Sequence, residues 1–507
     1  MKRNRSRAPL SWVSCLRLAT VPAVVLLSLA TCARSQSTQS ADIQDQVRRI
    51  NDAVNRVQSQ IDESQRELAE LKGQLAVLQG ATGGTTSTAS TEQPPAAADL
   101  AAAVAGIRET QAIEETQLAT LEQTKVESES KYPVKLSGLI LMTSMVNTQG
   151  VDMAQAPTIA LNGPGSTAAT IRQTIVGIDA SGPHLLGAAS RADLRFDFFA
   201  SPGGSGYGAS TALGILRMRT AHAQLDWQHS SAYFALDRPL LSPDTPTSLT
   251  AVAIPPLAWS GTLWSWNPQV GGQHDFFSNR AMSLRAQGAL IFVADPPSLY
   301  GTAATGTYLP PSTTEQSRWP GVQARLALVN VGGEDGARFG IGGYVAPHRL
   351  TQLTQFDSWA GTADFNFPVT RYTRISGSSY YGQALGGLGE GAFKDYVARL
   401  YKGEWYYRAP DDMGGWVQWK QHAGQRLEFN EAFGMDNVPA HQVRPYTITS
   451  ADSYYNLARN RTITGNVIYS PSAYLLFTLE YRRIASSFVN SPTEFSDVIG
   501  LGAGYKF

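Results

Sequence analysis

Charged and apolar side chains alternate over residues 190–200. The charged positions are Arg191, Asp193, Arg195 and Asp197, and apolar residues fill the places between them. An arginine guanidinium keeps its charge at physiological pH, and its planar set of donors matches carboxylate or phosphate groups. These arginines therefore suit electrostatic binding of small anions. In the alternative interpretation, the neighbouring acidic residues only neutralise them.

No pattern typical of an enzyme or a metal centre occurs in the sequence. The seven histidines are scattered and form no His-Glu-x-x-His motif, and there is no Gly-x-Ser-x-Gly motif. Both cysteines, Cys15 and Cys32, lie near the N-terminus and leave the rest of the chain without a cysteine ligand. The glycine-rich stretch 386–391 lacks the lysine of a phosphate-binding loop, so we interpret it as a turn. We expect no catalytic residue, cofactor or metal.

The alternation requires β-strands that have one ionic and one apolar face, because side chains of a strand point alternately to its two sides. The same period recurs in residues 322–328, where Arg325 lies on the polar side, and in residues 473–482. It recurs again in residues 499–507, with Lys506 on one face and Phe507 on the other. Such strands separate an apolar phase from water. We therefore predict an all-β transmembrane β-barrel over residues 132–507, with a large secreted β-protein as the alternative.

Three features favour the barrel over a secreted β-protein. They are an export signal, aromatic clusters such as Tyr380-Tyr381 and Trp416–Trp419 near strand ends, and an aromatic residue at the end of the final strand. The 376 residues from 132 to 507 allow about 16 antiparallel strands. A closed sheet of that size is too wide for its side chains to fill, so water enters.

Residues 1–35 are expected to be a secretory signal peptide. Basic residues at its start precede an apolar run over Leu18–Ala30, and small residues suited to cleavage follow. Cleavage after Ala33 or Ser35 would remove both cysteines. In the alternative, the stretch ending at Cys32 acts as a lipoprotein box and that cysteine carries lipid.

A heptad pattern over residues 36–79 predicts an α-helical coiled coil. Branched residues occupy both core positions, which favours more than two helices, so we predict a trimer. The seam consists of Ile43, Val47, Ile50, Val54, Val57, Ile61, Ser64, Leu68, Leu71, Leu75 and Leu78. A flexible linker over residues 80–98 and a second helical segment over residues 99–131 follow. An antiparallel hairpin of the two helical segments is the alternative.

Short stretches of the barrel segment resemble porin sequences. Residues 216–226 are similar to an early porin strand, Leu241-Ser242-Pro243 to the entry of a loop folded into the barrel, and residues 266–270 to its exit. Together with the order of coiled coil, linker and barrel, they make the chain similar to the DcaP-like trimeric porins of Gram-negative outer membranes. The phosphate-selective porin O/P group is a more distant likeness. This resemblance implies a trimer in the cell outer membrane, with the N-terminal segment in the periplasm.

The expected function is passive diffusion of small hydrophilic, preferentially anionic, solutes through the lumen. Residues 240–276, with Trp259, Trp264 and Trp266, are expected to form the loop that narrows it, or alternatively to pack over a neighbouring subunit. The candidate pore-lining residues are Arg191, Asp193, Arg195, Asp197, Arg217, Arg219, Arg325 and Lys506. The alternatives are a structural or adhesive barrel with a plugged lumen and, less favoured, an outer-membrane hydrolase.

The expected partners are two further copies of the chain, outer-membrane lipid, small anionic solutes and, through the coiled coil, peptidoglycan. The chain has 41 basic and 41 acidic residues, and this balance argues against a nucleic-acid partner. Residues 152–169 and 300–319, which are rich in small and polar residues, are expected to be surface loops.

Overall fold

The computed structural model describes residues 133–200, 214–277, 282–296, 311–330, 336–350, 354–447 and 453–507. The predicted signal peptide, coiled coil, linker and second helical segment lie outside these residues. Within the described ranges, no helix is long and apolar enough to cross a membrane.

Strands dominate the described part of the chain. They are β1 (Val134–Val151), β2 (Ala160–Thr170), β3 (Ile175–Leu185), β4 (Ala188–Ala200), β5 (Ile215–Asp226), β6 (Ser230–Asp237), β7 (Asn267–Phe276), β8 (Met282–Ile291), β9 (Gly321–Asn330), β10 (Arg338–Arg349), β11 (Gln355–Pro368), β12 (Thr373–Gln383), β13 (Val397–Tyr401), β14 (Glu404–Arg408), β15 (Asp411–Ala423), β16 (Leu427–Asn437), β17 (Leu457–Tyr469), β18 (Leu475–Phe488) and β19 (Thr493–Lys506). The short helices are α4 (Thr313–Ser317), η3 (Gly386–Leu388), η4 (Gly391–Phe393), α5 (Ala440–Val443), η5 (Arg444–Tyr446) and η6 (Tyr454–Asn456).

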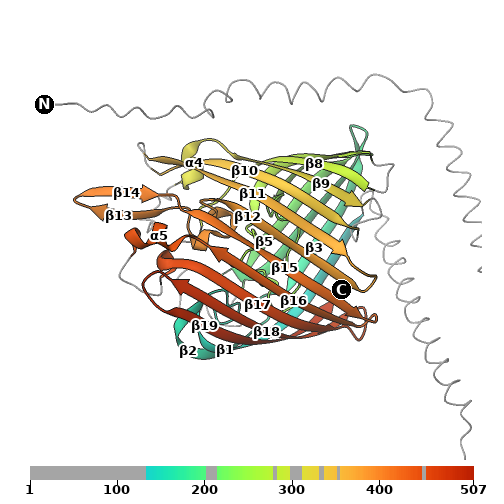
Figure 1. The fold of residues 1–507 in the computed structure, drawn as a ribbon. Coiled ribbons are helices and arrows are strands. Elements are labelled where there is room, and N and C mark those ends of the chain that lie inside the picture. Colours follow the sequence, from blue (N-terminus) through green and yellow to red (C-terminus); the bar gives the residue numbers. More distant parts are fainter. Residues whose placement is uncertain are drawn as a thin grey trace, which may run out of the picture. The chain divides into compact units, whose positions relative to one another are not determined.

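All of these strands except β13 and β14 form one closed antiparallel sheet (Figure 1). The cylinder closes where β1 pairs with β19, from Leu139 opposite Lys506 to Asn147 opposite Val498. Both β2 and β3 pair with β1, one along each half of it, so they are successive segments of a single wall strand. The 17 strands of the sheet therefore make 16 wall strands, the number expected from the sequence.

The wall has an apolar outer face and a polar inner face. In β9, Val322 and Leu326 are 49% and 50% exposed, whereas Gln323 and Arg325 on the opposite face are 1% and 3% exposed. The same alternation continues through β18 and β19, as the sequence predicts. Closure of the sheet gives every wall strand two hydrogen-bonded neighbours, which a strand needs in surroundings that offer the backbone no other partners.

The two ends of the cylinder differ in the length of their connections. At one end, short turns such as 186–187 and 424–426 join the strands, and the C-terminus lies beside the start of β1, where Gly138 N donates to Phe507 O (2.9 Å). At the other end lie the long connections, together with α4, α5 and the separate β13–β14 hairpin (Figure 1). We call these the turn end and the loop end.

Three expectations about segments need correction. Residues 160–169 were expected in a surface loop but belong to β2, whose small residues lack strong alternation and are held by the ladder with β1. The predicted narrowing loop ends at Trp266, because residues 267–276 form β7. Tyr380 and Trp416 face inward and are 5% and 4% exposed, so they do not contribute to an outer aromatic girdle.

Candidate functional site

The connection between β6 and β7 lies inside the barrel, where it contacts the wall from several sides. We call residues 238–266 the inner loop. Its backbone is hydrogen-bonded to side chains of wall strands that are far apart in the sequence. These contacts are Leu240 N to Gln323 Oε1 (2.9 Å), Thr247 N to Gln418 Oε1 (3.3 Å), Asn466 Nδ2 to Thr247 O (2.8 Å) and Asn460 Nδ2 to Trp259 O (3.1 Å). The inner loop is thus fastened across the lumen.

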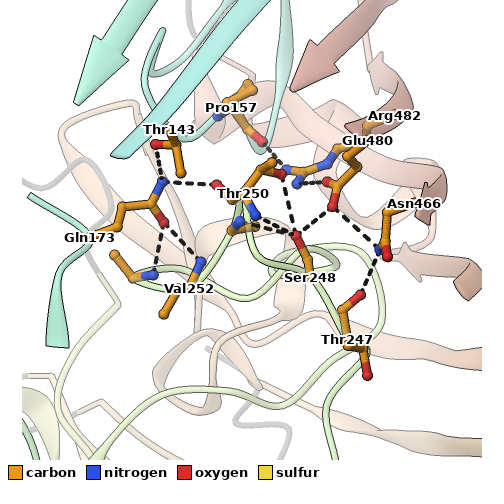
Figure 2. A network of polar contacts seen from close by, with 12 residues as sticks. Thr143, Pro157, Gln173, Thr247, Ser248, Thr250, Val252, Asn466, Glu480 and Arg482 are labelled. Carbon is orange, nitrogen blue, oxygen red and sulfur yellow. Dashed lines mark hydrogen bonds and ion pairs between the residues drawn. The ribbon is translucent and has the colours of Figure 1, made fainter. Parts of the chain in front are cut away.

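Gln173 forms three hydrogen bonds with the inner loop and a fourth with β1 (Figure 2). Its side-chain oxygen accepts hydrogen bonds from Val252 N (2.8 Å) and Ala253 N (3.1 Å). Its amide nitrogen donates to Thr250 O (2.8 Å) and to Thr143 Oγ1 of β1 (3.1 Å). Gln173 lies in the interruption between β2 and β3, so the break in the wall strand supplies a side chain that satisfies the loop's buried backbone groups.

Glu480 holds the neighbouring part of the inner loop (Figure 2). Its carboxylate accepts a hydrogen bond from Ser248 Oγ (2.5 Å) and pairs with Arg482 (2.5 Å). Arg482 also donates to the carbonyl of Pro157, in the β1–β2 connection (3.1 Å). Because Glu480 and Arg482 are 2% and 3% exposed, removal of either would leave a buried charge without its partner.

The predicted charged residues of β4 lie in a ladder of ion pairs with residues of neighbouring strands. Arg191 pairs with Asp226 (2.9 Å) and Arg195 pairs with Asp179 (2.6 Å). Asp193 lies 3.0 Å from Nδ1 of His222, whose Nε2 lies 3.0 Å from Asp237. Asp197 pairs with both Arg217 (2.6 Å) and Arg219 (3.6 Å). The acidic residues thus neutralise much of this arginine row.

A β-bulge interrupts the alternation of inward and outward side chains in the strand that contains Arg217 and Arg219. The register with β4 shifts between Arg195 and Phe196, where one extra residue is inserted in β5. Arg217 and Arg219 face Asp197 on one side of the bulge, and even-numbered His222 takes the inward position on the other. Period-two reasoning fails across such an insertion.

The other two predicted residues occupy different surroundings. Arg325 forms a buried ion pair with Asp364 (2.6 Å), and the two side chains are 2% and 1% exposed. Arg325 of β9 and Asp364 of β11 meet across β10 at Gly340. A side chain at position 340 would block this contact, because its Cβ atom would lie 2.5 Å from Arg325 Nη2. Lys506 is exposed at the last position of β19, at the turn end.

The three predicted tryptophans link the arginines of β5 to a second loop. Trp266 lies under the guanidinium groups of Arg217 and Arg219, at 5.0 and 5.1 Å from its ring centroid. Trp264 contacts Trp266 and Trp259 edge to face, each at 5.8 Å. Trp259 stacks on Phe393, with the ring centroids 3.7 Å apart. Phe393 belongs to the connection between β12 and β13, which sequence reasoning did not assign to the lumen.

This connection, residues 384–396, is called here the second loop. Glu390 accepts a hydrogen bond from Gly261 N of the inner loop (3.0 Å), and Lys394 donates to Leu457 O (2.7 Å). Burial raises the pKa of the Glu390 carboxyl well above its usual range and lowers the pKa of the Lys394 ammonium to about 7. Both shifts favour the neutral form, which suits the apolar cluster around Trp259 and Phe393.

A cavity of about 1220 Å³ lies between the inner loop and the turn end. Six basic and three acidic side chains line it, so positive charge is in excess. The lining charges are Arg191, Arg285, Arg338, Arg371, Arg374, Lys420, Asp244, Asp275 and Glu428. Most of these lining residues were not predicted from the sequence. Alternation could have found Arg285, because Leu284 and Leu290 mark the opposite face of β8, but it cannot place turn residues such as Arg371.

Neither a protein-family model nor a curated protein matches this sequence. Among solved structures, the outer membrane channel DcaP of Acinetobacter baumannii is similar, with a TM-score of 0.55 and 15% identity over 75% of this chain and 99% of that chain. The anion-selective porin from Comamonas acidovorans gives a TM-score of 0.46 and 10% identity, over 74% and 100%. OprB of Pseudomonas putida gives 0.41 and 9%, over 74% and 94%. The likeness to DcaP is one of fold, and it agrees with the resemblance expected from the sequence.

The contacts of Gln173 predict the effect of its removal. Gln173→Ala would leave the backbone groups of residues 250, 252 and 253 without their partners, at about 1–3 kcal/mol for each unsatisfied buried group. We expect lower stability in a urea titration and larger, less uniform single-channel conductance, because the inner loop is released. Gln287→Ala is the matched control, since Gln287 bonds to wall residues Gln273 and Arg325. Equal behaviour of the two variants would contradict the anchoring role.

Proposed function

We propose that the protein is an outer-membrane porin that lets small hydrophilic solutes, preferentially anions, diffuse passively through its lumen. The observation that carries this proposal is a closed 16-strand wall, apolar outside and charged inside, with an anchored loop across its interior. An apolar outer face suits lipid, and a barrel of this width holds water. A loop inside the lumen limits the size of what passes.

Anion preference is supported by the charge of the cavity rather than by the arginine row of β4. Asp244 pairs with Arg338, Asp275 with Arg285 and Glu428 with Lys420, so the acidic side chains of the cavity each have a basic partner. Arg371 and Arg374 also line the cavity and add to its positive charge. Like charges gathered in a narrow, low-dielectric passage raise the local concentration of counter-ions.

The selectivity proposal is tested by reversal potentials in a tenfold KCl gradient across a planar bilayer. The wild-type protein is expected to pass chloride more readily than potassium. In the double variant Arg371→Gln/Arg374→Gln, the permeability ratio should fall about twofold or more toward unity. Arg399→Gln is the control, because Arg399 lies in the β13–β14 hairpin, outside the wall. A cation-selective wild-type pore would refute the anion preference.

A second candidate is a structural or adhesive barrel whose lumen is plugged. It is favoured by the apolar cluster at the loop end, where Trp259 and Phe393 pack with Val438, Tyr455 and Phe488 in the interior of the barrel. The same bilayer recording separates the two candidates. Stepwise conductance increases support the porin, and their absence from correctly folded protein supports the plug.

We also propose a homotrimer held by the N-terminal coiled coil, residues 36–79, with that segment in the periplasm. Two branched positions per heptad support three helices. Deletion of residues 36–98 should lower the temperature at which trimers dissociate in a mild-detergent gel. An unchanged dissociation temperature would favour the other proposed role, a tether that reaches the peptidoglycan.

A further inference from the structure

Three potential metal ligands from distant parts of the chain converge at the loop end of the barrel. They are Asp295 in the β8–β9 connection, His348 near the end of β10 and Asp395 at the end of the second loop. One ligand atom from each lies within 4.8 Å of the other two. Asp295 and Asp395 lie 53 residues before and 47 residues after His348, so no sequence motif could reveal them.

Two of these three side chains also have a buried polar atom without a hydrogen-bond partner among the described residues. The atoms are Nε2 of His348 and Oδ2 of Asp395, in side chains that are 1% and 2% exposed. A buried polar atom without a partner costs about 1–3 kcal/mol. The cost is avoided if these two atoms bind a cation.

Thr313 determines which nitrogen of His348 carries a proton. The Thr313 hydroxyl donates its only hydrogen to Asp295 Oδ1 (2.6 Å), so it must accept the hydrogen bond that joins it to His348 Nδ1 (2.8 Å). Nδ1 is therefore protonated, and in the neutral ring Nε2 carries a lone pair. Metal-binding histidines commonly donate their second N–H in this way.

The two carboxylates are oriented by backbone groups. Asp295 accepts hydrogen bonds from Thr313 N at 3.0 and 3.1 Å, and Asp395 Oδ1 accepts one from Gly387 N (3.0 Å). Oδ2 of Asp395 has no hydrogen-bond partner among the described residues. Gly387 permits the close packing, because a Cβ atom there would lie 2.4 Å from Val293 Cγ1.

We propose that Asp295, His348 and Asp395 bind a divalent transition-metal ion of the Zn²⁺ type. An imidazole nitrogen suits Zn²⁺ and its neighbours better than Ca²⁺ or Mg²⁺, which prefer oxygen alone. With metal–ligand bonds of about 2.1 Å, ligand atoms around one ion lie about 3.4–4.2 Å apart, so small side-chain rotations suffice. Two carboxylates balance the charge, and Asp295, which is exposed, gives access from solvent.

A metal ion bound at this site would connect separate segments at the loop end of the barrel. It joins the β8–β9 connection and the barrel wall to the second loop, which in turn holds the inner loop. Ser265 Oγ of the inner loop donates to Gly387 O (2.8 Å), and Ser265 N donates to Leu388 O (3.3 Å). A bound ion is thus expected to stabilise the arrangement of both loops.

The test is Zn²⁺ titration of folded, untagged, EDTA-treated full-length protein by calorimetry. We expect one Zn²⁺ per chain, a higher melting temperature with Zn²⁺ and no competition from tenfold Ca²⁺ or Mg²⁺. His348→Ala and Asp395→Asn should each weaken binding about a hundredfold or more, and Thr313→Val about tenfold. His441→Ala, an exposed histidine in α5 at the same end, is the matched control and should bind like the wild type.

Circular dichroism is used first to confirm that each variant is folded. If His348→Ala does not fold, Asp395→Asn, which keeps the side-chain volume, provides the test of the site. Absence of Zn²⁺ binding by the folded wild type would overturn the proposal. Undiminished binding by the folded ligand variants would also overturn it, and equal binding of Ca²⁺ would refute the transition-metal assignment.

Discussion

The arrangement inside this barrel depends on hydrogen bonds between inward-facing side chains of the wall and the backbone of the inner loop. Sixteen strands enclose a space too wide for wall side chains to meet across it. A polypeptide segment placed in that space has backbone groups that need partners. Gln173, Gln323, Gln418 and Asn466 supply them, and each belongs to a different wall strand or to the break in one. The wall thereby determines the path of the loop.

Close approach to the wall requires small residues as well as hydrogen bonds. Gly434 of β16 faces the inner loop at Ser260, whose carbonyl oxygen would lie 2.1 Å from a Cβ atom at position 434. Gly340 leaves room for the Arg325–Asp364 ion pair to cross β10 in the same way. The high glycine content of the wall is thus related to what lies inside it. The loop end is packed with apolar residues, whereas the cavity toward the turn end is lined by charged ones.

The sequence predicted the strands of the wall better than the contacts inside the barrel. Period-two alternation identified the inward residues of β4 and β9, because every strand must place apolar residues on its outer face and polar residues on its inner face. It is interrupted in β5 at the bulge beside Arg219, and it missed β2, which has few bulky residues to mark a face. Ion-pair partners such as Asp364 for Arg325 could not be predicted, because they depend on strand order and register. The coiled coil stays a prediction, since its residues lie outside those described.

The inner loop's attachment is tested most directly by hydrogen exchange of individual backbone amides in the folded protein. The amides of Thr247, Val252, Ala253 and Gly261 donate to side chains of the wall or the second loop. They should exchange at least about a hundredfold more slowly than the amides of Lys402 and Gly403, in the turn of the β13–β14 hairpin. Exchange of both groups at the same rate would show that the loop is not held, and would contradict this account.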